Sequence, residues 1–282
     1  MSETLRELVR EAGKQLAAAG IASAALDARL LLQAATGLRH EEIVAEPDTT
    51  LPDDRKAQFW SLVERRRRFE PVSRILGNRE FYGRNFRVTP DVLDPRADTE
   101  TLVGAALGLA QGREALRILD LGTGSGAIAV TLLAELPGAS AAATDLSAEA
   151  LKVASGNARA LGVAERISFV QANWFDGVEG RFALIVSNPP YIPMGDIAGL
   201  APDVRAFDPQ KALDGGPDGL EAYRRIASGA ENHLAAGGQI LVEIGAGQES
   251  MVNALFKDQG FVLEGRHSDL SGHVRCLVFT RA

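Results

Sequence analysis

Two short segments of the sequence combine residue types that could bind a ligand and act on it. The first is Asn188-Pro189-Pro190-Tyr191, which follows the apolar run at residues 182–186. Two successive prolines cannot continue the hydrogen-bond ladder of a strand, so the chain must leave the sheet here with a stiff backbone and exposed carbonyl groups. The side-chain oxygen of Asn188 and the carbonyl of Pro189 could then accept two hydrogen bonds from one NH₂ group, while Tyr191 packs against its plane. We therefore predict that these four residues hold a planar amide or amine.

The second segment is rich in glycine and reads Asp120-Leu121-Gly122-Thr123-Gly124-Ser125-Gly126, between a predicted strand and a predicted helix. Glycines let the backbone turn tightly and approach a ligand without interference from a Cβ atom. Asp145, at the end of the next predicted strand, is suited to accept the hydroxyls of a ribose. Because Gly122, Gly124 and Ala127 also match a dinucleotide fingerprint, the loop alone predicts a nucleotide-type cofactor without deciding which one.

Strands and helices alternate through most of the chain after residue 90. Strands are predicted at residues 117–121, 139–144, 167–170, 182–186 and 239–244, with helices between them at residues 127–136, 148–161 and 220–234. Such alternation is typical of an α/β fold with a doubly wound parallel sheet and helices on both faces. Two closing strands, at residues 261–264 and 274–280, have no helix between them and could pair antiparallel at a sheet edge.

The N-terminal part has a different pattern, which predicts a small bundle of helices. Apolar side chains recur at helical spacing over residues 5–16 and 26–34, the second time after a possible cap at Ser23, and a third helix is predicted from about Asp53. Glycine, aromatic and β-branched residues then predict a short β-hairpin. We expect a helical domain at 1–73 with a role in partner recognition or packing, a hairpin linker at 74–90, and the main domain at 91–282.

Charge and histidine spacing argue against two kinds of site. The net charge is −7, and residues 1–80 contain 13 basic and 13 acidic side chains, so neither part is the basic domain that usually binds nucleic acid. The four arginines at residues 65–68 end a predicted helix, where a solvated face or pairing with the helix C-terminus is expected. The four histidines lack the spacing of metal ligands, so no metal is predicted.

The sequence also indicates the compartment. The single cysteine, Cys276, cannot form an internal disulfide and lies in an apolar run, which predicts a buried thiol and fits a reducing environment. The N-terminus lacks the basic start and apolar core of a signal peptide, and no apolar stretch approaches the roughly 20 residues that span a bilayer. We expect a cytoplasmic protein without membrane contact.

Several segments together resemble one protein family over nearly the whole chain. They are FEPV at residues 69–72, the run at 77–81, PRADTE at 95–100, the glycine loop at 120–126, NPPY at 188–191, ALDGGPDGL at 212–220 and EIG at 243–245. Adenine methyltransferases of DNA share NPPY, so the flanking segments make the resemblance specific. On these residues the chain resembles the bacterial peptide chain release factor N(5)-glutamine methyltransferases, the PrmC/HemK family.

The resemblance implies a class I methyltransferase fold, Rossmann-like with an antiparallel last strand. It implies transfer of a methyl group from S-adenosyl-L-methionine, with S-adenosyl-L-homocysteine as product, to the glutamine amide in the Gly-Gly-Gln motif of peptide chain release factors. The expected cofactor-binding residues are Gly122, Thr123, Gly124, Ser125, Gly126, Asp145, Trp174 and Asn188. The expected catalytic and substrate-binding residues are Asn188, Pro189, Pro190 and Tyr191. The helical domain would help to bind the release factor, without direct contact to nucleic acid.

Three positions depart from the family pattern. Asn173 stands where an acid usually precedes the tryptophan; it can accept a hydrogen bond from an adenine amino group but brings no charge. Asp94 and Ala97 replace an apolar residue and a proline, so the turn around them is expected to be looser, and Arg96 and Thr99 are left out of the predicted site. These differences bear on cofactor affinity more than on the type of reaction.

Two other functions are compatible with some of these residues. An N-methyltransferase acting on an exocyclic amine of a nucleic acid is expected to have a basic recognition domain, which the charge counts do not favour. A catalytically silent nucleotide-binding adaptor is expected to have a damaged acceptor motif, whereas residues 188–191 are intact. A protein glutamine methyltransferase is therefore the preferred hypothesis.

Overall fold

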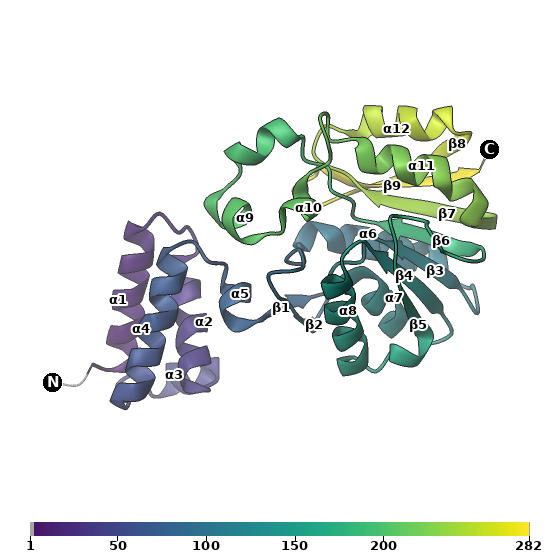
Figure 1. Cartoon of the computed structure of the whole chain (residues 1–282). Helices are drawn as coiled ribbons and strands as arrows, with labels where there is room; N and C mark the ends of the chain where they lie inside the picture. The colour runs from purple at the N-terminus through teal and green to yellow at the C-terminus, as the bar shows by residue number, and fades with distance from the viewer. Residues whose placement is uncertain (1–2, 282) are drawn as a thin grey trace. The chain divides into compact units, whose positions relative to one another are not determined.

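The computed structural model describes residues 3–281, and Figure 1 shows their helices and strands along the chain. The chain divides into two units, each with dense internal contacts. The first comprises the residues up to Asn78 together with Ala201–Phe207, and the second comprises Arg79–Leu200 and the residues from Asp208 onward.

The first unit is helical. Its helices are α1 (Leu5–Ala18), α2 (Ala24–Thr36), α3 (His40–Ala45), α4 (Asp53–Arg67), α5 (Val72–Leu76) and α9 (Pro202–Phe207). Leu8, Leu31 and Phe59, from α1, α2 and α4, are fully buried in one apolar cluster. The three predicted N-terminal helices are thus confirmed. The helix α3 is not predicted from the sequence, because its six residues provide too little apolar periodicity to indicate a helix.

A buried ion pair joins α4 to α2 within this unit. Arg66 Nε donates to Asp27 Oδ2 at 2.7 Å, and the Ser23 hydroxyl donates to the same oxygen at 2.8 Å. Ser23 precedes α2 as predicted but makes no capping hydrogen bond. The prediction of a solvated arginine run is wrong for Arg66, which is 9% exposed, because a buried guanidinium needs a charged partner and Asp27 supplies one. The neighbouring arginines pair with Glu64 and Glu70 nearer the surface.

A seven-stranded mixed sheet forms the centre of the second unit. Its strands are β3 (Arg117–Leu121), β4 (Ser140–Asp145), β5 (Ile167–Gln171), β6 (Phe182–Ser187), β7 (Leu234–Glu243), β8 (Phe261–Ser268) and β9 (Val274–Arg281). Their order is β5-β4-β3-β6-β7-β9-β8, in which β3 to β7 run parallel and β9 is antiparallel to both of its neighbours. The predicted doubly wound sheet with an antiparallel last strand is confirmed.

Helices cover both faces of this sheet, as Figure 1 shows for α7 and α8 on one side and α11 and α12 on the other. The helical segments are η1 (Ala97–Thr99), α6 (Glu100–Ala110), α7 (Ala127–Glu135), α8 (Ala148–Ala160), η2 (Ala164–Arg166), η3 (Met194–Gly199), α10 (Gln210–Leu213), α11 (Glu221–His233) and α12 (Glu249–Asp258). Successive strand residues point to opposite faces, so Ile118 packs with the cluster of α6 and α7 and Leu119 with that of α11 and α12. Within residues 3–281, no helix has the length and apolar character needed to cross a membrane.

The predicted hairpin and the predicted buried cysteine are also present. The strands β1 (Asn78–Phe81) and β2 (Arg84–Arg87) form a two-stranded sheet. Phe81 and Phe86 pack edge to face, with ring centroids 6.0 Å apart, and both are buried in the cluster that includes α6 and α7. Cys276 is fully buried in the same cluster.

The direction in which strands are added reverses beside β3. From β3 the chain adds β4 and β5 on one side, and it then returns to add β6 and β7 on the other. The carboxyl ends of β3 and β6 therefore lie next to each other, with Asp120 in register with Val186. A parallel sheet opens a crevice at such a point, which is where proteins of this architecture bind ligands. The glycine loop and residues 188–191 leave the sheet at this crevice.

Candidate functional site

The glycine loop joins β3 to α7 and is held from inside the protein by Asp120. One oxygen of this fully buried carboxylate accepts hydrogen bonds from the Thr123 hydroxyl at 2.7 Å and the Ala129 N–H at 3.3 Å. Burial raises the pKa of Asp120 to about 7, and these two hydrogen bonds oppose the rise. Asp120 thus fixes the loop against the first turn of α7.

The last glycine of the loop lies where α7 passes close to α8. Gly126 has a φ of +83°, and a Cβ atom there would lie 3.1 Å from the Cβ and 3.3 Å from the Cα of Ala154. Glycine meets both requirements, because it tolerates positive φ and leaves room for the neighbouring helix. The position is therefore set by packing behind the loop.

Asp145 ends β4 and faces the same crevice. Its Oδ2 accepts a hydrogen bond from the Gly124 N–H at 2.9 Å, and its Oδ1 accepts one from the Ser147 N–H at 2.8 Å. Asp145 therefore organises the glycine loop and the start of α8 at the same time. A carboxylate has lone pairs for further donors, so these hydrogen bonds leave Asp145 able to accept the hydroxyls of a ligand.

Asn188 leaves the sheet at the end of β6, beside the glycine loop. The hydroxyl of Ser187 donates to the carbonyl of Leu121 at 2.7 Å, which ties the end of β6 to the end of β3. The Asn188 side chain then donates from Nδ2 to the Thr99 hydroxyl at 3.0 Å. The orientation of the Asn188 amide is thus fixed by a residue that is 89 positions away in the sequence.

The segment after Asn188 is held by hydrogen bonds to two distant parts of the chain. Ile192 forms a parallel bridge with Asp214, and the Gly215 N–H donates to the Ile192 carbonyl at 2.9 Å. The Gln248 side chain donates to the Tyr191 carbonyl at 2.9 Å. Burial raises the pKa of Tyr191 to about 12, so its phenol stays neutral at physiological pH. Residues 212–220 and 243–248 therefore support the conformation of residues 188–191.

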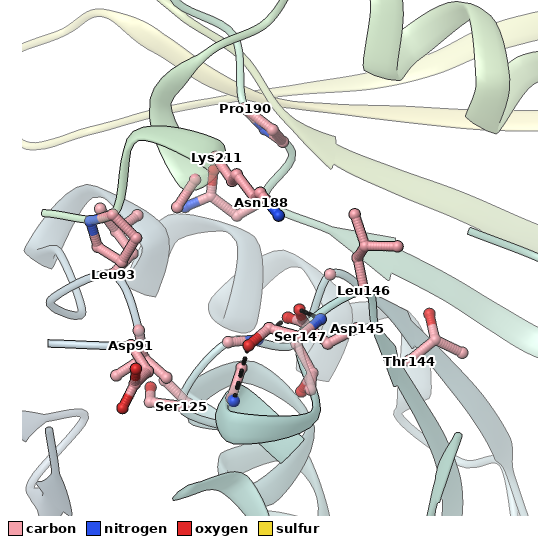
Figure 2. A pocket seen from close by; sticks show the side chains of 18 of the residues that line it. Asp91, Leu93, Ser125, Thr144, Asp145, Leu146, Ser147, Asn188, Pro190 and Lys211 are labelled. Atoms are coloured by element: carbon pink, nitrogen blue, oxygen red, sulfur yellow. Dashed lines mark hydrogen bonds between the residues drawn. The ribbon is translucent and has the colours of Figure 1, made fainter. Parts of the chain in front are cut away.

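These segments enclose one cavity of about 620 Å³, a volume typical of small-molecule sites. The predicted site residues that line it are Gly122, Thr123, Gly124, Ser125, Asp145, Trp174, Asn188 and Pro190. Gly126, Pro189 and Tyr191 do not line it, although each adjoins a residue that does. Figure 2 shows Asn188 and Pro190 on one side of the cavity, with Ser125, Asp145 and Ser147 on the other.

Trp174 has a strained backbone conformation at the wall of this cavity. Its φ of +60° is unusual for a residue with a side chain and is tolerated only where the surroundings fix it. The Cζ3 atom of its ring lies 4.0 Å from the position that a Cβ would take at Gly122. The indole thus lies beside the glycine loop, where it can pack against a planar ligand.

Arg96 and Thr99 are not part of the predicted site, yet both line the cavity. Arg96 forms an ion pair with Asp208, whose side chain is almost completely buried, and Thr99 accepts the hydrogen bond from Asn188. The sequence does contain a signal for these two residues, because both belong to the PRADTE segment that carries the family resemblance. The departures at Asp94 and Ala97 did not displace them from the cavity.

The cavity offers two kinds of hydrogen-bond acceptor at its opposite sides. Asp145 presents a carboxylate beside the glycine loop, and Asn188 presents an amide where the polypeptide leaves β6. Such a site can bind a ligand that carries hydroxyl groups at one end and can orient an NH₂ group at the other. The arrangement suits the transfer of a group between two bound molecules.

Comparisons with known proteins agree with a site for group transfer. The family described as PrmC N-terminal domain matches residues 7–77, and the family described as Methyltransferase small domain matches residues 103–198. A release factor glutamine methyltransferase of Agrobacterium fabrum is 45% identical over 274 residues, covering 96% of this chain and 95% of its own. One of Cereibacter sphaeroides is 47% identical over 269 residues, covering 95% of each.

A solved structure supports the fold independently. A methyltransferase from Pyrococcus furiosus aligns with a TM-score of 0.51 at 19% identity, covering 71% of this chain and 89% of that one. At such low identity the likeness concerns the fold alone. The sequence relatives, by contrast, match almost from end to end. This chain belongs to the release factor glutamine methyltransferase family.

Proposed function

We propose that this chain transfers a methyl group from S-adenosyl-L-methionine to the side-chain amide nitrogen of the glutamine in the Gly-Gly-Gln motif of peptide chain release factors. The observation that carries the proposal is the position of Asn188, whose amide lines the same cavity as the glycine loop and Asp145. One cavity can therefore receive a nucleoside cofactor and an amide acceptor together. Full-length similarity to release factor glutamine methyltransferases supports the choice of acceptor.

The residues around the cavity fit S-adenosyl-L-methionine. We assign Asp145 to the ribose hydroxyls, Trp174 to the adenine, and the loop from Gly122 to residue 126 to the methionine and ribose part. When bound, the cofactor supplies an electrophilic methyl group on a sulfonium, and S-adenosyl-L-homocysteine is left after transfer. Asn173 lines the cavity beside Trp174, where its side-chain oxygen can accept a hydrogen bond from the adenine amino group.

Asn188 and Pro189 have the task of holding the acceptor. An amide nitrogen is a poor nucleophile because its lone pair is delocalised into the carbonyl. Two carbonyl acceptors, Asn188 Oδ1 and the Pro189 backbone, fix the plane of the NH₂ group and favour the positive charge that develops on nitrogen. Correct placement of two reactants can contribute up to roughly 7 to 11 kcal/mol. The nitrogen gains the methyl group and releases one proton.

We assign recognition of the release factor to the helical unit, and we expect the reaction in the cytoplasm, where translation takes place. A nucleic-acid acceptor is less well supported, because residues 1–80 contain equal numbers of basic and acidic side chains. Proteins that bind nucleic acid directly usually concentrate positive charge. A silent adaptor is disfavoured because Asn188 and its supporting contacts are intact.

Replacement of Asp145 by alanine is expected to weaken cofactor binding by roughly 1 to 3 kcal/mol, the scale for losing a hydrogen bond to a charged group. Part of the loss will come through the loop, because Asp145 also accepts the Gly124 N–H. Isothermal titration calorimetry with S-adenosyl-L-homocysteine measures it. Glu149→Ala, in the exposed first turn of α8, is the control for removing a nearby acid. An unchanged dissociation constant in Asp145→Ala would contradict the assignment.

The proposed function is tested by peptide mass spectrometry of purified release factor after incubation with this protein and S-adenosyl-L-methionine. We expect one added methyl group on the Gly-Gly-Gln glutamine. Release factor with that glutamine replaced should remain unmodified under the same conditions. If the factor gains no methyl group while the protein binds the cofactor, the acceptor must be sought among nucleic acids.

A further inference from the structure

A second buried carboxyl group lies behind the cavity, and no role has been assigned to it above. Glu243 ends β7 and is 2% exposed, and its Oε2 has no hydrogen-bond partner among residues 3–281. Burial raises its pKa to about 7, helped by the charge of Asp98 and opposed by that of Arg275. A buried acid with an unsatisfied oxygen costs a fold stability, so its presence calls for an explanation.

The groups around Glu243 connect it to the acceptor site. The hydrogen-bonding groups of Thr99 and Asn188 lower the pKa of Glu243 and so favour its ionised form. Thr99 is 4% exposed, and its oxygen accepts the hydrogen bond from Asn188 Nδ2 at 3.0 Å. A hydroxyl has one hydrogen and two lone pairs, so Thr99 can receive the Asn188 NH₂ group while it donates to Glu243. The three side chains thus lie together, from Asn188 at the cavity wall to the buried carboxyl group of Glu243.

We propose that Glu243 is a positioning residue, which through Thr99 holds the Asn188 amide with its NH₂ group inward and its carbonyl oxygen toward the acceptor. An ionised carboxylate can only accept hydrogen bonds, so the part of the amide that faces it and Thr99 must be the NH₂ group. The other end of the amide, Oδ1, is then directed away from Glu243. The inference rests on the proposed function, because it concerns how that reaction selects the orientation of Asn188.

The orientation matters because the two ends of an asparagine amide have opposite hydrogen-bonding character. If the amide turned by half a rotation, its NH₂ group would face the NH₂ group of the acceptor, and neither could accept. A neutral group at position 243 that can both donate and accept removes the distinction between the two orientations. The charge of Glu243 therefore matters more than its volume.

Glu243→Gln tests the charge at nearly constant shape. We expect kcat for methyl transfer to fall by about tenfold to 100-fold, the scale for a misplaced reacting group, while the cofactor dissociation constant stays within about twofold. Cys276→Ala is the matched control, because Cys276 lies opposite Glu243 on β9, is fully buried and has no hydrogen bond to Asn188 or Thr99. It should lower the melting temperature and leave kcat within about twofold of wild type.

A second pair of variants tests the connection at Thr99. Thr99→Val removes the hydroxyl at constant shape, and Thr99→Ser keeps it. We expect Thr99→Val to turn over at least about tenfold more slowly than Thr99→Ser, because only serine can pass the hydrogen bond on to Glu243. This comparison also covers the case in which Glu243→Gln does not fold. Equal rates in the two Thr99 variants would overturn the proposal.

The pH profile provides a readout that a merely structural role would not change. The titratable or charged groups facing Glu243 are Asp98 from η1, Arg275 and Cys276 from β9, Tyr191, and Tyr223 from α11. Burial raises the pKa of Cys276, Tyr191 and Tyr223 above their usual values, so those three stay neutral between pH 6 and 8. Protonated Glu243 can donate, so wild-type kcat should fall as pH drops below about 7.

In Glu243→Gln, kcat should be low and should not fall further as the pH drops over the same range. If kcat of Glu243→Gln still fell below about pH 7, or equalled that of wild type at pH 8, the role of Glu243 would be overturned. Failure of the proposed function is distinguishable, because wild-type protein would then add no methyl group to the release factor at any pH.

Discussion

Asn188→Ala is expected to lower kcat for methyl transfer by about 10²- to 10³-fold, the range measured when one preorganised hydrogen-bonding group is removed from an active site. The side chain lines the cavity and is fixed by Thr99, so its carbonyl oxygen is already oriented before the acceptor binds. Alanine removes this hydrogen-bonding oxygen, so the amide nitrogen that receives the methyl group is free to rotate. Single-turnover kinetics with purified release factor measures the loss.

In Asn188→Ala we expect the rate of methyl transfer to change much more than the affinity for the cofactor. The cofactor dissociation constant of Asn188→Ala is expected to stay within about tenfold of wild type, because the loss falls mainly on the transition state. Asn253→Ala in α12 is the matched control, since it also removes an asparagine side chain but lies outside the cavity lining. Near-normal turnover in Asn188→Ala would show that the acceptor is held by other groups.

Two of the strands that carry the site, β3 and β6, could be predicted because each is a short apolar run followed closely by a glycine or a proline. The prediction for β3 matches residue for residue, since Gly122 interrupts it directly. The prediction for β6 ends one residue early, at Val186, because the polar Ser187 looks like the start of a loop. In the structure Ser187 is buried, and its hydroxyl donates to the Leu121 carbonyl. A polar side chain that satisfies a neighbouring strand end cannot be recognised from periodicity.

The second layer of the site could not be predicted from spacing. Thr99 and Glu243 contact Asn188 only because η1 and the end of β7 meet behind the cavity. Thr99 belongs to the PRADTE segment and Glu243 lies inside the predicted strand at residues 239–244, but neither spacing nor periodicity shows that the two side chains meet beside Asn188. Burial of a carboxyl group is a property of the tertiary structure, as Asp27 in the helical unit also illustrates.

Gly219→Ala is expected to disrupt the acceptor site from behind. Gly219 has a φ of +75°, and a Cβ atom there would lie 2.5 Å from the Tyr191 carbonyl oxygen and 3.0 Å from Gln248 Nε2. Those two groups are hydrogen-bonded to each other at 2.9 Å, so the new methyl group must displace the contact that holds Tyr191. The left-handed conformation alone costs an L-residue roughly 1 to 2 kcal/mol.

The displaced backbone includes Tyr191, which is next to Pro190. A misplacement of about 1 Å in an active site can lower the rate by about 100-fold. We therefore expect the rate of methyl transfer in Gly219→Ala to fall by at least about tenfold. A loss of about 2 kcal/mol should also lower the melting temperature by roughly 4 to 8 °C. Gly195→Ala is the control, because a Cβ there meets no atom within 4 Å. If Gly219→Ala lost stability but kept full activity, the conformation of Tyr191 would not depend on this packing. If the melting temperature and the rate of methyl transfer both fell, residues 212–220 would be shown to stabilise the conformation of Asn188 and its neighbours. This segment would then have a physical role in addition to that of residues 188–191.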